Sequence, residues 1–363
     1  MSAVVARAPG KAVLIGEYAV LHGAPALAMA VDRHARVRIE PCARDQCRVS
    51  TPQLGIASVG FSIESGSIQW DVEAPGWPAL RQTASMLSFL HGLVIERFGD
   101  PGAFSVEIDT AELFIDTSAG PIKLGLGSSS AVAVALDAGL RLFAGGPAES
   151  GLSMRALHRL LKPYRRGQDG QGSGIDLASC LCGGVISYQR HGDEPEVSRL
   201  ALPANLSLMF VWTGQAASTP DLLQRYQRWR REQADEAGRI QAEMHRICCS
   251  AQAAMAGGDA EALIEHFHCY GGLMRTMGLS MGVDLLGAEH GRIRARAEQL
   301  GLAYKPCGAG LGDLGMVAAA DPARLNEMRS WLEASGIAVM PLAVDAEGVQ
   351  AMLESDQIEI NQN

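Results

Sequence analysis

The stretch KLGLGSSSAVAVAL, residues 123–136, joins a glycine-rich loop to the start of a helix. Gly125 and Gly127 let the backbone approach a ligand closely, and three serines follow them. From Ser129 onward apolar residues recur at helical spacing, the serines are N-cap candidates, and glycines at 145 and 146 predict the helix end. A helix start directs backbone N–H groups and a positive dipole end at one spot, so a phosphate would fit there.

The loop matches neither of two common nucleotide-binding patterns. No Gly-Lys-Ser/Thr ends it, and Ser129 stands where the third glycine of GxGxxG belongs. The stretch alone therefore leaves two readings open, a nucleotide site of another kind or a loop that only caps a buried helix.

Composition sets the class of protein. A chain of 363 residues with 47% hydrophobic content can bury more than one core, which predicts two domains. The net charge of -9 argues against general binding to nucleic acid or to anionic membranes, so an anion site would have to be local. Without a leader-like start or a long apolar run we expect a cytoplasmic protein, and the eight cysteines lack zinc spacing and predict reduced thiols.

The remaining pattern predicts an α+β protein. The opening strands are expected to be broken at Gly and Pro turns, and one long helix is expected to start at Thr219 and continue to Ile247. Near the C-terminus, helices alternate with strands, which indicates an antiparallel sheet backed by helices. The expected strands lie at 4–5, 13–15, 35–39, 104–108, 113–115, 315–320 and 337–344, and the expected later helices at 284–301 and 321–336.

Three further stretches add candidate site residues. In GQDGQGSGIDLASCLCGG, residues 167–184, glycines precede Asp176 at a predicted helix start, where a carboxylate can be a plain helix residue or can face a ligand. In KPCGAGLGDLGMVAA, residues 305–319, the glycines are too many for one tight turn. Lys11, in RAPGKAVLIGEYAVLHG at 7–23, is by itself a weak signal because most loop lysines are solvated.

Together these stretches resemble the signature motifs of the GHMP kinases. APGK with GEYAV, then GLGSSS, then GAGLGD occur in the family's order and span nearly the whole chain. The resemblance implies a GHMP kinase-like two-domain α+β fold, with a ribosomal protein S5 domain 2-like N-terminal domain at 1–190, which binds ATP, and a ferredoxin-like C-terminal domain at 191–363. The site would lie between them.

The resemblance also implies roles for residues. Lys11 and Asp176 would be catalytic, Ser129 would reach Mg²⁺, and the loop would hold the phosphates of ATP. The implied phosphate-loop residues are Gly125, Leu126, Gly127, Ser128, Ser129 and Ser130, and the implied substrate-binding residues are Lys123, Ser218, Thr219, Gly308, Ala309 and Gly310.

Within the family, VWTGQAASTPDL, the lysine before GLGSSS and the aspartate closing GAGLGD look most like the phosphomevalonate kinase branch. The partner would then be a small molecule, phosphomevalonate or mevalonate, with no nucleic acid and no membrane, and a homodimer is left open. The alternatives are a mevalonate kinase acting on a hydroxyl and a regulator that keeps the fold without turnover. Leu311 departs from the family's GAGGGD, and it would need a backbone φ that leucine avoids or would crowd a ligand.

Overall fold

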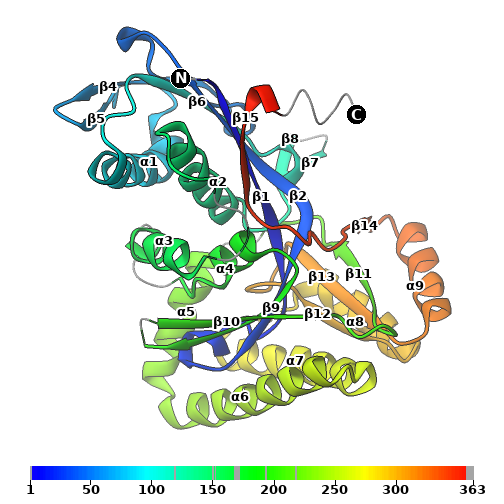
Figure 1. Cartoon of the computed structure of the whole chain (residues 1–363). Helices are drawn as coiled ribbons and strands as arrows, with labels where there is room; N and C mark the ends of the chain where they lie inside the picture. The colour runs from blue at the N-terminus through cyan, green and yellow to red at the C-terminus, as the bar shows by residue number, and fades with distance from the viewer. Residues whose placement is uncertain are drawn as a thin grey trace.

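The computed structural model describes residues 2–117, 120–148, 151, 153–166, 172–192, 194–216 and 219–356. Figure 1 shows a long twisted sheet that runs through the molecule, with helices packed beside it and a second, smaller sheet at its lower end. Ser218, one of the predicted substrate-binding residues, lies outside the described residues.

The large sheet is organised around the hairpin of β1 and β2. The strands follow the order β10-β9-β2-β6-β3-β4-β5, while β1 pairs with β2 and with β15. Its β3–β6 pairing is parallel and the other pairings are antiparallel. The strands are β1 (Val4–Ile15), β2 (Ala26–Pro41), β3 (Arg48–Thr51), β4 (Ile56–Glu64), β5 (Ser67–Trp70), β6 (Phe104–Asp109), β9 (Val185–His191), β10 (Glu194–Leu200) and β15 (Gln350–Leu353).

β1 is continuous, so the predicted break at Pro9 and Gly10 is wrong. The register with β2 shifts between these two residues, which means that a bulge absorbs them within the strand. A bulge accommodates a proline without a ladder N–H and bends the strand locally. Lys11, one residue later, is therefore held on a regular strand rather than in a loop.

Helices cover one face of this sheet. α2 packs across β1 and β2, with α1 and α4 against it, and α3 packs on α4 (Figure 1). The residues of α2 are almost all buried, which explains its apolar sequence. These helices are α1 (Trp77–Phe98), α2 (Ser128–Phe143), α3 (Met154–Arg166) and α4 (Ile175–Cys182), and a small hairpin of β7 (Phe114–Thr117) and β8 (Gly120–Lys123) leads into α2.

The later part of the chain forms the predicted antiparallel sheet, in the order β12-β13-β11-β14. Alternate residues of β11 and β13 enter different cores: Phe210 and Met316 join the main core, whereas Val211 and Val317 pack with α8 and α9. The elements are β11 (Ser207–Trp212), α5 (Thr219–Glu232), α6 (Ala234–Gly257), α7 (Ala260–Ser280), α8 (Gly287–Gln299), β12 (Ala303–Pro306), β13 (Leu314–Ala319), α9 (Pro322–Ala334) and β14 (Ala338–Met340).

The predicted long helix from Thr219 is in fact two helices. Gln233 leaves the helical conformation between α5 and α6, with φ -129° and ψ 54°. The Ser280 hydroxyl donates to the Gln233 side chain at 3.3 Å and accepts from the Trp229 indole at 2.9 Å. This contact with the end of α7 lets α5 turn away while α6 runs beside α7 (Figure 1), and no local sequence signal marks it.

The sheet does not divide at the predicted domain boundary. Residue 190 lies within β9, which pairs with β10 as a hairpin, and the chain enters the second sheet only at Ser207. At the end of the chain β15 returns to pair with β1, with Val4 opposite Leu353. The division into 1–190 and 191–363 stays a prediction.

Candidate active site

The predicted phosphate loop has the backbone that its glycines suggested. Gly125 and Gly127 both lie in the left-handed region, with φ 78° and 76°. Gly127, rather than a serine, is the N-cap of α2, so the predicted serine N-cap is wrong. Ser130 is buried, and its hydroxyl donates back to the carbonyl of Gly127 at 2.6 Å, which braces the turn and leaves Ser129 exposed beyond it.

Lys11 lies directly against this loop. Its backbone N–H donates to the carbonyl of Leu126 at 2.8 Å, which fastens the loop to β1. A Cβ on Gly127 would be 3.1 Å from Cε and 3.3 Å from Cγ of Lys11, so the lysine stem fills the space that a side chain at 127 would need. Position 127 therefore needs glycine for two reasons: its φ is positive, and the Lys11 side chain leaves no room for a Cβ.

Asp176 lies in the first turn of α4, the helix that packs on α2. One of its carboxylate oxygens, Oδ1, accepts from the N–H of Leu177 at 3.1 Å, and the other, Oδ2, accepts from the Tyr164 hydroxyl at 2.6 Å. Burial, followed by the charge of Asp176, holds the pKa of Tyr164 well above its usual value. Tyr164 is thus a donor at neutral pH, and no sequence pattern singled it out.

Cys180, on α4, contacts the same loop as Lys11 does. Its thiol donates to the Ser130 hydroxyl at 3.6 Å. Burial raises the pKa of Cys180 to about 12, the contact with Ser130 opposes the rise, and the charges of Asp176 and Lys11 act in opposite directions on the same thiol. Through Ser130, the buried sulfur on α4 contacts the loop to which the backbone of Lys11 is hydrogen-bonded.

The third glycine stretch closes over the loop from the later part of the chain. Asp313 packs so closely on Gly125 that a Cβ added to Gly125 would lie 2.5 Å from the Cβ of Asp313. Leu311 has φ 66° and Asp313 φ 58°, so the predicted unfavourable φ at Leu311 is confirmed. The leucine side chain, 37% exposed, points toward the start of α8, where its Cδ2 would lie 3.7 Å from a Cβ on Gly287.

A buried ion pair holds the two parts of the chain together below this loop. Nζ of Lys305, which is fully buried, lies 2.5 Å from Oε1 of Glu17 and also donates to the Pro306 carbonyl. The same glutamate oxygen accepts from the N–H of Gly308 at 3.3 Å. Next to it, Tyr18 donates to the Ala309 carbonyl at 2.6 Å. Sequence reasoning did not find this pair, because a buried lysine has no local signature.

Two further predicted site residues, Lys123 and Thr219, are exposed. Lys123 is exposed at the end of β8, two residues before Gly125. Thr219 is exposed at the start of α5. The segment that follows β11 is hydrogen-bonded to the third glycine stretch. The N–H of Asp313 donates to the carbonyl of Gln215, and the carbonyl of Asp313 accepts from Thr213. The structure therefore places Lys123 and Thr219 at the surface, whereas Lys11 and Asp176 are half-buried.

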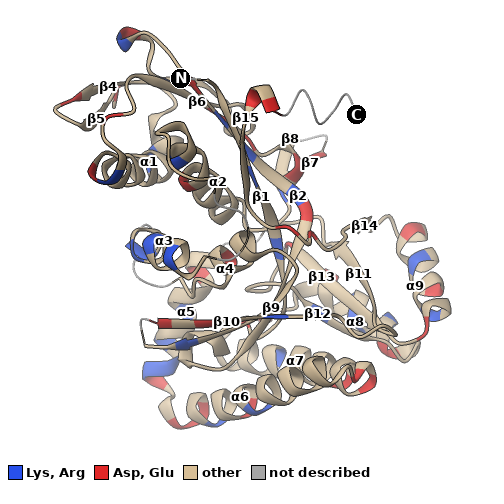
Figure 2. Ribbon diagram, viewed as in Figure 1, with Lys and Arg blue, Asp and Glu red and all other residues tan. Residues whose placement is uncertain are grey.

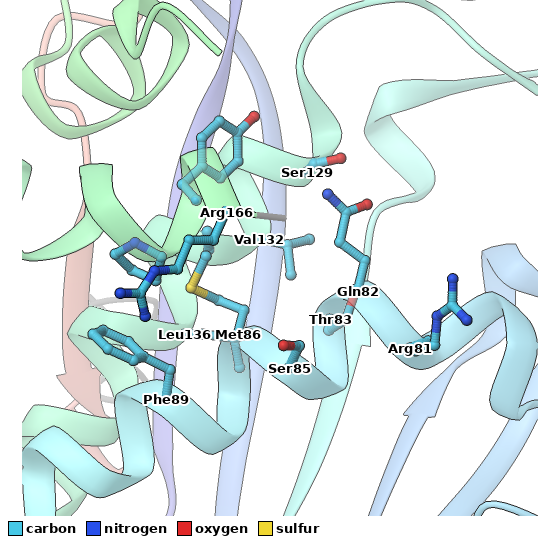
Figure 3. A pocket seen from close by; sticks show the side chains of 13 residues that line it. Arg81, Gln82, Thr83, Ser85, Met86, Phe89, Ser129, Val132, Leu136 and Arg166 are labelled. Carbon is cyan, nitrogen blue, oxygen red and sulfur yellow. The ribbon is translucent and has the colours of Figure 1, made fainter. Parts of the chain in front are cut away.

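A cavity of about 590 Å³ opens beside Ser129, between α1, α2 and α3 (Figure 3). This volume is in the range of small-molecule sites. Its basic side chains come from α1 and α3, whereas α2 contributes apolar side chains beyond Ser129, and α3 carries Lys and Arg along its length (Figure 2). The lining residues are Arg81, Gln82, Thr83, Ser85, Met86, Phe89, Ser129, Val132, Ala133, Leu136, Pro163, Tyr164 and Arg166.

Comparison with known proteins places the chain in a family. The model for the GHMP kinases N terminal domain matches residues 89–184, the segment that holds the predicted phosphate loop and Asp176. A phosphomevalonate kinase from Streptomyces sp. (strain CL190) is 30% identical over 95% of this chain and 98% of its own length. The chain belongs to the GHMP kinase family.

Other members of the GHMP kinase family agree with the fold. A mevalonate kinase from Thermococcus sibiricus is 26% identical over 96% of this chain and 98% of its own length. The structure of Streptococcus pneumoniae phosphomevalonate kinase in complex with phosphomevalonate and AMPPNP superposes with a TM-score of 0.75 at 18% identity, covering 95% of this chain and all of that one. The predicted α+β GHMP kinase fold is thus confirmed.

Two further findings concern the described residues alone. None of their helices is long and apolar enough to cross a membrane. They also hold no cluster of three or more His, Cys, Asp or Glu side chains arranged to bind a metal ion.

Proposed function

We propose that this GHMP kinase transfers the γ-phosphoryl group of ATP to phosphomevalonate and so makes diphosphomevalonate. The observation that carries the proposal is that the 125–130 loop contacts both Lys11 and Cys180, and that Cys180 lies one turn after Asp176 in α4. A cation, a phosphate-binding helix start and a carboxylate in one place are what phosphoryl transfer needs, because it depends on alignment and charge neutralisation. The 30% identical phosphomevalonate kinase supports this acceptor.

ATP would bind with its phosphates on the loop from Gly125 to Ser130, at the N-terminus of α2. The cavity beside Ser129 has room for the rest of the nucleotide. Ser129 also fits a role toward Mg²⁺, since its hydroxyl is exposed where the phosphates would lie, and Mg²⁺ in kinases takes few protein ligands besides phosphates and water. When bound, the ion would neutralise charge on the phosphates.

The acceptor would lie between Lys11 and Asp176. Lys11 would neutralise charge on the moving phosphoryl group, and Asp176 would orient the acceptor. A phosphate acceptor is already ionised near neutral pH, so general-base help matters less than positive charge. Lys123, at the mouth of the loop, would supply that charge to the phosphate of the acceptor.

The other end of the substrate would be held by the later part of the chain. Thr219 stands at the start of α5, where free N–H groups favour a carboxylate or phosphate, and Ser218 precedes it in the sequence. The backbone of Gly308, Ala309 and Gly310 would form the opposite wall. In this arrangement both parts of the chain contact the acceptor.

The test is ADP release with Mg²⁺-ATP and one acceptor at a time: phosphomevalonate, mevalonate, homoserine, galactose or none. Release that depends on phosphomevalonate alone, and that disappears in Lys11→Ala, would support the proposal. Release without an acceptor dependence would contradict it. Clear ATP binding with no release for any acceptor would favour the regulator instead.

A mevalonate kinase is the second candidate, supported by the 26% identical archaeal relative. A hydroxyl acceptor must lose its proton, and Asp176 would then act as the base. Release with mevalonate but not with phosphomevalonate would establish this alternative and would leave Lys123 without a function at the acceptor.

A further inference from the structure

Tyr164 stands between the two halves of the candidate site. Its ring lines the cavity beside Ser129, and its hydroxyl donates to the carboxylate of Asp176 at 2.6 Å. The side chain is almost fully buried, with 4% of the residue exposed. One residue of α3 thus contacts both the proposed nucleotide space and the carboxylate of Asp176, which is proposed to orient the acceptor.

The hydroxyl completes the hold on the carboxylate. The N–H of Leu177, within α4 itself, donates to Oδ1 of Asp176, and Tyr164 donates to Oδ2. A carboxylate with a donor on each oxygen has a fixed plane, whereas one donor leaves it free to rotate about χ2. The contact from α3 is therefore the one that sets which way Asp176 faces.

α3 is in turn packed tightly on the turn before Asp176. A Cβ on Gly174, which has φ 91°, would lie 2.2 Å from Cδ2 of Leu161, so the helix rests directly on the glycine. Arg165 donates to the Ser173 carbonyl at 3.2 Å, and Tyr188 donates to the same carbonyl at 2.7 Å. The donor and the acceptor of the Tyr164 contact are thus held by the same rigid unit.

We propose that Tyr164 is a positioning residue that fixes Asp176 in the orientation the acceptor requires, while its ring forms a wall of the nucleotide space. The inference rests on the proposed function, in which Asp176 aligns the acceptor. It goes beyond that function because it makes the orientation of Asp176 depend on α3, the helix that borders the cavity.

The test is a double-mutant cycle with Tyr164→Phe and Asp176→Ala, measured with whichever acceptor the wild-type protein uses. Tyr164→Phe keeps the ring and removes the hydroxyl. We therefore expect the KM for ATP to stay within about 2-fold and kcat to fall about 10-fold, the scale of one hydrogen bond to a charged group. In the Asp176→Ala background the same change should leave kcat as it is, because its partner is gone.

Tyr188→Phe is the matched control. Tyr188, on β9, is also buried, but its hydroxyl donates to the backbone carbonyl of Ser173, in the turn before α4, rather than to the carboxylate of Asp176. Any effect of Tyr188→Phe on kcat should therefore be the same in the wild-type background and in the Asp176→Ala background. Far-ultraviolet circular dichroism and the unfolding midpoint of each variant show that it is folded.

Three outcomes decide the question. A loss of kcat in Tyr164→Phe that vanishes in the Asp176→Ala background supports the inference. An equal loss in both backgrounds, or no loss at all in an active protein, overturns the inference and leaves the proposed function standing. A folded wild-type protein that turns over neither phosphomevalonate nor mevalonate refutes the proposed function, and the inference falls with it.

Discussion

Replacing Lys305 with methionine tests how strongly the buried ion pair joins the two parts of the molecule. Lys305 is fully buried and the Glu17 side chain is 4% exposed, with 2.5 Å between Nζ and Oε1. Lys305→Met keeps most of the side-chain volume but leaves the carboxylate of Glu17 buried without its cation. Removing one partner of a buried pair costs about 3–5 kcal/mol, mostly as the penalty of the uncompensated charge.

This cost translates into a measurable shift. A chain of 363 residues has an unfolding entropy of roughly 0.8 kcal/mol/K, so each kcal/mol moves the melting temperature by about 1.3 °C. Lys305→Met should therefore lower Tm by about 4–7 °C in differential scanning calorimetry. The Glu17→Gln/Lys305→Met double variant should recover most of this loss, because neither charge remains and the new side-chain amide oxygen can still accept from the N–H of Gly308.

The reasoning would be refuted by a Tm for Lys305→Met within about 1 °C of the wild-type value, or by a double variant that melts lower than the single one. Lys162→Met, a lysine of α3 on the surface, is the control for loss of a positive charge alone, and its Tm should barely change.

Four further changes test other parts of the molecule. Asp176→Asn should cut turnover about 10²-fold or more while isothermal titration shows ATP binding nearly intact, and unchanged turnover would remove Asp176 from the mechanism. Lys123→Ala should raise the KM for a phosphorylated acceptor much more than that for ATP, and equal effects would count against its role. Leu311→Gly should raise Tm by about 1 °C, since glycine adopts φ 66° without the strain of a side chain, and a lower Tm would show that the leucine contact near Gly287 outweighs that strain. Burial alone would raise the pKa of Asp345, but hydrogen bonds from His34 and from backbone N–H groups lower this pKa below its usual value. The ionised carboxylate therefore stabilises the fold near pH 6, and this contribution is lost as the pH falls below about 4. Asp345→Asn should flatten the acid side of the Tm profile between about pH 5 and 3, and a profile parallel to the wild type would contradict this.

The parts of the site that could be predicted from the sequence are those encoded locally. Gly125 and Gly127 indicate a left-handed backbone, because other residues avoid that conformation. Leu311 indicates backbone strain, because it stands among glycines in a loop that needs a positive φ. Asp176 and Lys11 were predicted as site residues from motif order, since neither is distinctive alone. In the fold, the antiparallel sheet near the C-terminus followed from alternating strand and helix patterns.

The parts that could not be predicted depend on residues far apart in the chain. Glu17 and Lys305 are 288 positions apart, and nothing near either one marks it as half of a buried pair. The end of α5 at Gln233 is set by Ser280 of another helix. Tyr164 precedes Asp176 by 12 positions, but only the packing of α3 on α4 turns that spacing into a hydrogen bond.

The return of β15 to β1 has a consequence for how the protein is made. In β1, the strand that carries Lys11, the outer edge of Val4 to Arg7 pairs with residues 350–353, far along the sequence. Until residues 350–353 have been synthesised, that edge has no β15 to pair with, and unpaired N–H and C=O groups at a strand edge invite association with other chains. The nascent protein must therefore carry an open strand edge while all the residues between β1 and β15 are translated.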